Sequence, residues 1–264
     1  MIQIIDKSNC CGCTACFCKC PTKAIIMKQD EEKFLYPNID LNKCIKCGLC
    51  EKVCPIINKS LYKEESTPGY IVRNRDFDIV KDSTSGGAFS AISTFFFNKG
   101  GIIYGAGFND EKQVLCKKAN NSKDLEEMRG SKFVQSELGY TFVEIKKELA
   151  DNKMVVFSGT PCQVNGLITF LGGKPQNLFC IDFVCRGVSS PGLWENYISY
   201  MQKKYKSKIV DVKFKNKTYG YHASTMYVKF ENGKSWYGSG RIDPMMKAFV
   251  NELASRPSCE KCKF

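Results

Sequence analysis

Two runs of four cysteines near the start of the chain share one spacing. The first run is Cys10, Cys13, Cys16 and Cys20, and the second is Cys44, Cys47, Cys50 and Cys54. Each run follows C-x2-C-x2-C-x3-C and is closed by a proline. Thiolates at this spacing hold [4Fe–4S] clusters, and the fourth cysteine of each run ligates the cluster of the other run. The sequence therefore predicts one cluster on Cys10, Cys13, Cys16 and Cys54, and a second on Cys44, Cys47, Cys50 and Cys20.

A pair of zinc knuckles is the alternative for these runs, but it would use C-x2-C pairs and leave the third and fourth cysteines unexplained. The small residues Gly12, Ala15 and Gly48 let the backbone approach the cluster sulfurs closely. Short strands are expected over 24–27 and 36–40. Cys11 and Cys18 fall outside the spacing and are interpreted as thiols that bind no metal. We expect an α+β two-cluster ferredoxin-like domain over residues 1–58.

The cysteine content and the net charge limit the cellular compartment and the kinds of binding partner that are expected. Eight of the sixteen cysteines stand at ligand spacing, which requires reduced thiols. The first residues show no secretory signal pattern, and no apolar run is long enough for a membrane span. We expect a cytoplasmic protein. The formal charge of +12 falls to about +8 once two clusters carry about −2 each. The lysines are spread out without interleaved aromatic residues, so no nucleic-acid partner is expected.

The segment 59–69 is polar and ends at Pro68-Gly69, which predicts a linker before a second domain over 70–264. In that domain helices are expected over 88–96 and 138–149, and two further helices should begin at residues 190 and 243. Strands are expected over 102–108, 154–157, 178–184, 209–214, 225–230 and 235–237. The first of these helices should bury an apolar face that includes Ile92 and Phe95. This alternation predicts an α/β mixed sheet.

Three turns, at residues 83–88, 157–163 and 182–188, carry residues suited to chemistry. Ser85, Gly86 and Gly87 lead into a helix, where free N–H groups suit a phosphate, although such residues are often only caps. Gly159 and Thr160 follow a strand at the edge where α/β sheets bind ligands. The next cysteine, Cys162, could be a nucleophile, a metal ligand or a small core residue. The only histidine, His222, is far along the chain and is expected at the surface.

Four further thiols could form one more site. They are Cys162, Cys185, Cys259 and Cys262. Four thiols suit another [4Fe–4S] cluster or a zinc ion, but single cysteines are also ordinary core residues. Spacing alone leaves these readings open.

Taken together, several segments resemble the beta-subunit family of the coenzyme F(420) hydrogenases and dehydrogenases, in the version with an N-terminal two-[4Fe-4S] ferredoxin domain. They are residues 85–90, 104–106, 130–136, 158–163, 184–191 and 256–264. The resemblance implies a flavin-type domain with FAD, a third [4Fe–4S] cluster on Cys162, Cys185, Cys259 and Cys262, and cofactor contacts from Ser85, Gly86, Gly87, Lys132, Gly159 and Thr160.

The chain departs from the family pattern at several positions. Arg186 replaces a usual histidine, Phe133 a usual tyrosine and Ser189 a common proline. No catalytic acid is therefore assigned. Relatives continue beyond the position of Phe264, so we expect an incomplete flavin domain.

These observations favour an iron–sulfur flavoprotein oxidoreductase. Ferredoxin or another redox protein would exchange electrons with the clusters, and the flavin would act on an organic substrate or a deazaflavin-like coenzyme. The alternative is a non-enzymatic electron-relay subunit that docks on a catalytic partner. A third reading is a fragment whose last cysteine pair holds zinc structurally.

Overall fold

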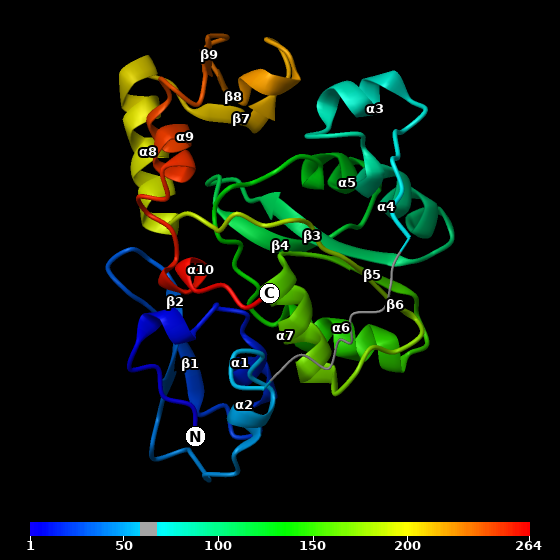
Figure 1. The fold of residues 1–264 in the computed structure, drawn as a ribbon, viewed down its shortest axis with the longest axis vertical. Coiled ribbons are helices and arrows are strands. Elements are labelled where there is room, and N and C mark those ends of the chain that lie inside the picture. Colours follow the sequence, from blue (N-terminus) through cyan, green and yellow to red (C-terminus); the bar gives the residue numbers. More distant parts are fainter. Residues whose placement is uncertain (59–67) are drawn as a thin grey trace.

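The computed structural model describes residues 1–58 and 68–264, so most of the predicted linker lies outside the described residues. A 3-10 helix, Lys7–Asn9, precedes α1 (Ala15–Lys19), and an antiparallel pair, β1 (Ile25–Gln29) and β2 (Leu35–Ile39), leads to α2 (Leu49–Lys52). The two strands lie within two residues of the expected ranges. A ferredoxin-like segment thus stands at the N-terminus (Figure 1).

A four-stranded sheet forms the centre of the remaining chain. Its strands are β3 (Ile102–Phe108), β4 (Val114–Lys118), β5 (Val155–Ser158) and β6 (Leu178–Ile181), in the order β4-β3-β5-β6. The strands β3, β5 and β6 are parallel, whereas β4 returns antiparallel beside β3. The mixed sheet expected from the sequence is confirmed, and β6 ends three residues earlier than expected.

Helices cover both faces of this sheet. The helices α4 (Ala88–Asn98) and α5 (Ser122–Met128) pack over Ile103 and Val156. The helices α6 (Thr141–Ala150) and α7 (Pro161–Leu171) pack on the other face, over Tyr104 and Phe157. Successive strand residues point to opposite faces, and this alternation divides the buried side chains between the two helical layers.

The expected apolar face of α4 was wrong in part. Ile92 and Phe95 are 39% and 53% exposed, whereas Ser90 and Ser93 are buried. Ser93 Oγ donates to the carbonyl oxygen of Phe89 at 2.7 Å, so its hydroxyl is satisfied within the helix. A buried serine that bonds to its own helix costs little, and it lets α4 lie close to the sheet.

The C-terminal half adds a separate three-stranded antiparallel sheet of β7 (Ile209–Asn216), β8 (Thr225–Phe230) and β9 (Ser235–Gly238). The helices α8 (Pro191–Tyr205) and α9 (Pro244–Val250) complete this layer around the fully buried Trp194. Two short helices, α3 (Phe77–Asp82) and α10 (Pro257–Glu260), and a 3-10 turn at Tyr221–Ala223 complete the description. His222 is exposed in that turn, as expected.

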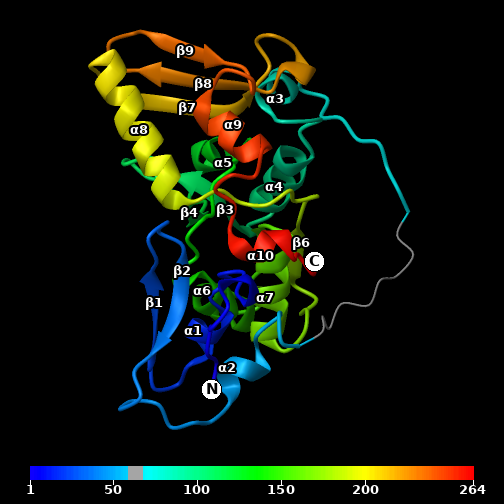
Figure 2. The same ribbon diagram turned by 60° about the vertical axis from the view of Figure 1, so that its left-hand side comes forward.

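The ferredoxin-like segment shares a hydrophobic core with the larger sheet. Cys11, Cys13, Ala15 and Val53 are buried in the same cluster as the inner faces of α6 and α7. Thr169 Oγ1 on α7 donates to the carbonyl oxygen of Val53 at 2.8 Å. Figure 2 shows α1 beside α7. The division at residue 58 stays a prediction about domains, but the packing across it is continuous.

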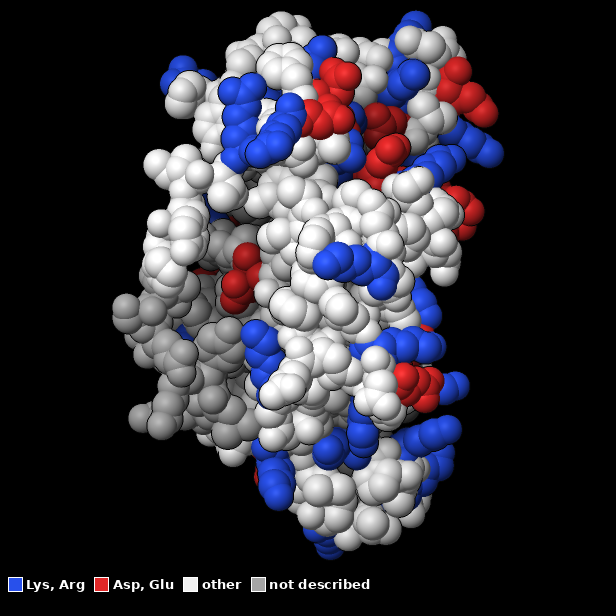
Figure 3. Space-filling view, turned by 90° about the vertical axis from the view of Figure 1, so that its right-hand side faces the viewer, with Lys and Arg blue, Asp and Glu red and all other residues white. Residues whose placement is uncertain are grey.

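Charged side chains are spread over the surface. On the face in Figure 3, lysine and arginine side chains are distributed from one end of the molecule to the other, with acidic groups between them. Within the described ranges, none of the helices combines the length and apolar character needed to cross a membrane.

Candidate metal centres and cofactor cleft

The predicted first cluster site brings together cysteines from both runs. Cys13, Cys16 and Cys54 are 7%, 7% and 8% exposed. Burial raises the pKa of Cys16, and the neighbouring thiols of Cys10 and Cys54 raise it further. Burial and the thiols of Cys10 and Cys50 likewise raise the pKa of Cys54. Cys54 of the second run therefore lies beside Cys10 and Cys16 of the first run.

The four cysteines predicted for the second cluster line one small cavity. Cys20, Cys44, Cys47 and Cys50 share it with Ala24, Ile25 and Gly48. Backbone N–H groups point at two of the sulfurs: Ala24 N lies 3.2 Å from Cys20 Sγ, and Ile2 N lies 3.3 Å from Cys50 Sγ. Burial alone would raise the pKa of Cys20, but hydrogen bonds from Thr22 and Ala24 outweigh it and lower the pKa. Hydrogen bonds of this kind stabilise a thiolate ligand.

The four cysteines predicted for the third site also lie near one another. Cys162 lies in the first turn of α7, Cys185 follows β6, and Cys259 is carried by α10. Burial raises the pKa of Cys259 to about 11, and the thiols of Cys162, Cys185 and Cys262 contribute to the rise. Gly187 N donates to Cys185 Sγ at 3.3 Å. The structure thus gathers thiols from three distant segments.

Cluster binding by these thiols stays a prediction. In residues 1–58 and 68–264, no group of three or more His, Cys, Asp or Glu residues is arranged to hold one metal ion. A cubane binds each thiolate at a different iron, so its four ligands stand further apart than the ligands of one zinc ion. The raised thiol pKa values are compatible with this, because a coordinating metal deprotonates a thiol outright.

Cys11 has a position that its spacing did not predict. Its buried thiol lies beside the thiols of Cys13 and Cys162, and the thiol of Cys13 together with burial raises the pKa of Cys11. Helix α7 runs along the same junction, since a Cβ on Gly166 would stand 2.7 Å from Cys13 Cβ and 2.9 Å from Cys13 Sγ. Cys162 and Gly166 are one helical turn apart and so share a face of α7. Cys18, the other thiol outside the spacing, donates to the carbonyl oxygen of Gly139 at 3.5 Å.

Arg256 and Gln135 were parts of the resemblance without an assigned role. Arg256 is 1% exposed and donates from Nε to the carbonyl oxygen of Cys10 at 2.7 Å. Its Nη1 donates to Gln135 Oε1 at 2.7 Å, and Gln135 Nε2 donates to the carbonyl oxygen of Cys11 at 3.2 Å. The only sequence signal was the position of Arg256 three residues before Cys259.

The predicted phosphate turn is covered by protein backbone. Gly86 lies so close to the Val72 carbonyl oxygen that an added Cβ would stand 2.4 Å from it. The carbonyl oxygen of Gly86 accepts from Asn74 N at 2.7 Å. Phosphate binding by Ser85, Gly86 and Gly87 stays a prediction, and it requires the segment 72–74 to move.

The Lys132 side chain caps the C-terminal end of helix α5. Its Nζ donates to the carbonyl oxygens of Glu127, Met128, Arg129 and Gly130 at distances of 2.8 to 3.3 Å. Three of the four lie at or just beyond the end of α5, where carbonyl groups lack partners within the helix. Burial lowers the pKa of Lys132 to about 7, and the nearby Lys117 acts in the same direction. The ammonium is thus committed to protein carbonyls.

Gly159 and Thr160 lie at the third cysteine group. Thr160 N donates to Gln163 Oε1 at 3.1 Å, which caps α7. Thr160 Oγ1 lies 3.1 Å from Cys162 Sγ. A Cβ on Gly159 would stand 3.0 Å from Gln163 Oε1 and from the Phe157 ring. These residues therefore support Cys162, and their contact with a flavin stays a prediction.

A cleft of about 560 Å³ opens between α5, the β3–β4 hairpin and β7. Its size falls in the range of about 300–1,000 Å³ typical of small-molecule sites. Lys132 and Thr84 line it, and Thr84 Oγ1 lies 3.1 Å from Ser131 Oγ. Arg129 and Lys213 form ion pairs with Asp82 at its wall.

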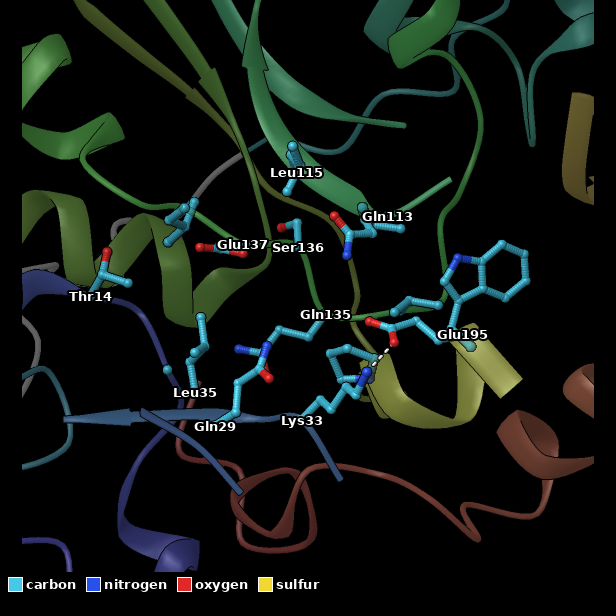
Figure 4. Close-up of a pocket in the computed structure, with 16 residues that line it drawn as sticks. Thr14, Gln29, Lys33, Leu35, Gln113, Leu115, Gln135, Ser136, Glu137 and Glu195 are labelled. Atoms are coloured by element: carbon cyan, nitrogen blue, oxygen red, sulfur yellow. Dashed lines mark hydrogen bonds and ion pairs between the residues drawn. The ribbon is translucent and has the colours of Figure 1, made fainter. Parts of the chain in front are cut away.

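A smaller cavity of about 60 Å³ lies between the β1–β2 hairpin and the start of α8 (Figure 4). Lys33 and Glu195 form an ion pair across its mouth, and Gln135 and Ser136 line its inner wall. This volume holds a few water molecules, and it is too small for a flavin.

Comparison with known proteins agrees with this arrangement. Residues 152–264 match the family described as the C-terminal part of the beta subunit of coenzyme F420 hydrogenase/dehydrogenase, and residues 37–56 match "4Fe-4S binding domain". Residues 152–264 are thus similar to the C-terminal part of the coenzyme F420 hydrogenase/dehydrogenase beta subunits. The first match contains the four thiols of the third group. The second match contains the second cysteine run, Cys44 to Cys54. The resemblance expected from the sequence is confirmed.

Two curated relatives and one solved structure define the extent of the similarity. A subunit of the F(420)H(2) dehydrogenase of Methanosarcina mazei is 24% identical over 62% of this chain and 49% of its own length. "Ferredoxin 7Fe" of Hydrogenibacillus schlegelii is 37% identical over 24% of this chain and 77% of its own. A chain of the F420-reducing [NiFe] hydrogenase complex from Methanosarcina barkeri has 17% identity and a TM-score of 0.44, over 73% of this chain and 66% of that chain. The chain spans about half the length of the dehydrogenase protein it matches.

Proposed function

We propose that this chain is a member of the F420 hydrogenase/dehydrogenase beta-subunit family and acts as an iron–sulfur flavoprotein oxidoreductase. Cys10, Cys13, Cys16 and Cys54 would hold a first [4Fe–4S] cluster, and Cys20, Cys44, Cys47 and Cys50 a second. Cys162, Cys185, Cys259 and Cys262 would hold a third. The single observation that carries the proposal is that the thiols of Cys11 and Cys162 are neighbours, which joins the N-terminal cysteine runs to the third group.

The residues around this junction would position the first and third clusters for electron transfer, and they do not form a substrate pocket. Gly166 lets α7 pass directly over Cys13, and Thr160 contacts Cys162 at the start of the same helix. The packed core between the two sites excludes water and fixes their separation. Bound iron–sulfur clusters carry single electrons, and a bound flavin exchanges one or two. Electrons would enter from a ferredoxin or another redox protein.

We assign FAD to the cleft of about 560 Å³. Its volume and its mixed ion pairs suit a large polar cofactor. Ser131 and Thr84 offer hydroxyl groups at its wall, and movement of the segment 72–74 would open the turn at Ser85–Gly87 beside it. The substrate would be an organic molecule or a deazaflavin-like coenzyme, in keeping with the name of the Methanosarcina relative.

A second candidate is an electron-relay subunit that binds no substrate and docks on a catalytic partner. Two observations favour it: the Val72 carbonyl oxygen fills the space above Gly86, and four protein carbonyls engage Lys132. In this candidate the iron sites are the same and the flavin is absent.

Anaerobic purification with iron, zinc and flavin quantitation separates these functions. About twelve irons with one FAD per chain is the expected result for the oxidoreductase. About twelve irons without flavin, even after incubation with FAD, would favour the relay. About eight irons with one zinc would replace the third cluster by a structural zinc site. An iron content near zero after reconstitution would rule out both electron-transfer functions.

A further inference from the structure

Arg256 carries a buried charge, and no carboxylate pairs with it in the part of the chain that the structure describes. The Arg256 side chain is 1% exposed and is among the largest fully buried side chains of the protein. Among the described residues, the arginines that form ion pairs are Arg129, with Asp82, and Arg186, with Glu252. Burying an unpaired guanidinium is costly, because the charge loses its hydration. A counter-charge for Arg256 is therefore to be sought among its neighbours.

The neighbours of Arg256 are carbonyl groups, rings and one thiol. Its guanidinium donates to the carbonyl oxygens of Cys10 and Leu35, at 2.7 and 3.0 Å, and Nη2 lies 3.6 Å from Cys10 Sγ. Its central carbon lies 4.3 Å from the centre of the Tyr36 ring. The carbonyl groups and the ring supply partial negative charge only. Among the groups that the guanidinium contacts, the thiol of Cys10 becomes a full anion when it binds iron. A neighbouring thiol and burial raise the pKa of Cys162 in the third group, and the charge of Arg256 opposes that rise.

The backbone of Arg256 reaches the third cysteine group. Arg256 N donates to the carbonyl oxygen of Val188 at 3.1 Å, three residues after Cys185. Cys259 N donates to the carbonyl oxygen of Arg256 at 2.8 Å. One residue thus connects Cys10, through its side chain, with the segments that carry Cys185 and Cys259, through its peptide groups.

The packing leaves the guanidinium no freedom to move. A Cβ on Gly12 would stand 2.6 Å from Gln135 Nε2 and 2.9 Å from Arg256 Nη1, and Gly12 has φ +71°. Gln135, at the wall of the cavity in Figure 4, holds the guanidinium from the other side. The charge is therefore fixed beside Cys10, within the shared packing of the two sites.

We infer that Arg256 is a positioning residue and the counter-charge of the first cluster site, which it ties to the third. This inference rests on the cluster assignment proposed above. Reduction of a cluster adds one negative charge, so a fixed positive charge at Cys10 favours the reduced form and raises the reduction potential of that cluster. The same contacts set the distance between the first and third sites.

The test is a redox titration followed by electron paramagnetic resonance on the anaerobically reconstituted full chain. Arg256→Gln removes the charge, and Arg256→Lys keeps it but loses the planar fork. Lys7→Gln is the matched control, because Lys7 also lies over the Tyr36 ring but is exposed and paired with Asp30. Iron content is measured for every variant.

In Arg256→Gln, the equilibrium ratio of reduced to oxidised first cluster should fall at least tenfold, which corresponds to about 59 mV for one electron. Arg256→Lys should show a smaller fall, and Lys7→Gln should match the wild type. Full iron content with an unchanged potential in Arg256→Gln would overturn the inference. If Arg256→Gln fails to take up the first cluster, restoration of that cluster by Arg256→Lys supports the counter-charge, and loss in both variants assigns a structural role only and overturns it. Absence of iron from the wild type would instead overturn the cluster assignment.

Discussion

The thiols of Cys11 and Cys162 are neighbours that shift each other's pKa, so the first cysteine run meets the amino end of helix α7 inside the protein. Cys11 is buried and Cys162 is partly buried, and the core around them includes Cys13, Val164 and Leu167. A ferredoxin-like segment attached only by a linker would have no such contact. The candidate iron sites are therefore neighbours within one packed structure, and a substitution at one site should affect the other.

The first prediction separates ligand thiols from contacting thiols. Cys162→Ala should lower the iron content by about four per chain and leave the signals of the two N-terminal clusters intact, because it removes a ligand of the third site only. Cys11→Ala should keep the iron content, because Cys11 contacts the sites without ligating iron. Iron analysis with paramagnetic resonance checks both. Unchanged iron in Cys162→Ala would contradict the third cluster, and loss of four irons in Cys11→Ala would make Cys11 a ligand.

Local patterns in the sequence predicted most of the fold. The sequence correctly predicted strands over 225–230 and 235–237, which form the hairpin of β8 and β9. It could not say which sheet the hairpin would join, because partner choice depends on contacts distant in sequence. Periodicity also failed for α4, where Ser90 and Ser93 are buried while Phe95 is exposed. The helix lies close to the sheet there, and small residues suit that approach better than large apolar ones.

The sequence could predict those parts of the candidate site whose residues lie close together in one segment of the chain. The spacing of the N-terminal cysteines predicted their grouping, but the contacts of Arg256 with Cys10 span 246 positions in the sequence. An arginine in a charged, lysine-rich chain gives no signal that it is buried. The same holds for Cys11, whose neighbours become visible only when α7 is folded against the first run.

The second prediction concerns the pH dependence of stability. The pKa of Lys132 in the folded protein is lowered to about 7 by burial, whereas an unfolded lysine has a pKa near its usual value of about 10.4. Between these values the unfolded chain binds more protons, so this group makes the folded state more stable as pH rises. The stability of the wild type relative to Lys132→Met should therefore increase from pH 7 to pH 10. Urea unfolding at several pH values measures it, and a flat or falling difference would show that the four carbonyl groups keep Lys132 charged.

The third prediction concerns the buried Asp243, which ties together the C-terminal layer. Its carboxylate accepts from Tyr197 OH at 2.8 Å, from Trp236 Nε1 at 3.0 Å and from Met246 N at 2.9 Å. Asp243→Ala leaves these buried donors without an acceptor and should lower the free energy of unfolding by about 3 kcal/mol or more. Tyr197→Phe removes one of the three bonds and should cost about 1–2 kcal/mol. Urea unfolding compares them. Equal losses would mean that Asp243 acts through Tyr197 alone, and iron content should stay unchanged in both.

The last prediction tests the close approach of α7 to the first cluster site. In a helix interior, replacing glycine by alanine normally stabilises by about 0.5–1 kcal/mol. In Gly166→Ala the new methyl group would stand 2.7 Å from Cys13 Cβ, in a core with no room to yield. Overpacking of this kind costs about 1–3 kcal/mol, so the variant should be destabilised despite its better helix propensity. Because Cys13 must shift, iron content should also fall by up to one cluster. Gly240→Ala is the matched control, since a Cβ on Gly240 meets no atom within 4 Å, and it should keep wild-type iron and stability. A more stable Gly166→Ala protein with full iron content would mean that α7 and the first cluster site are not in direct contact.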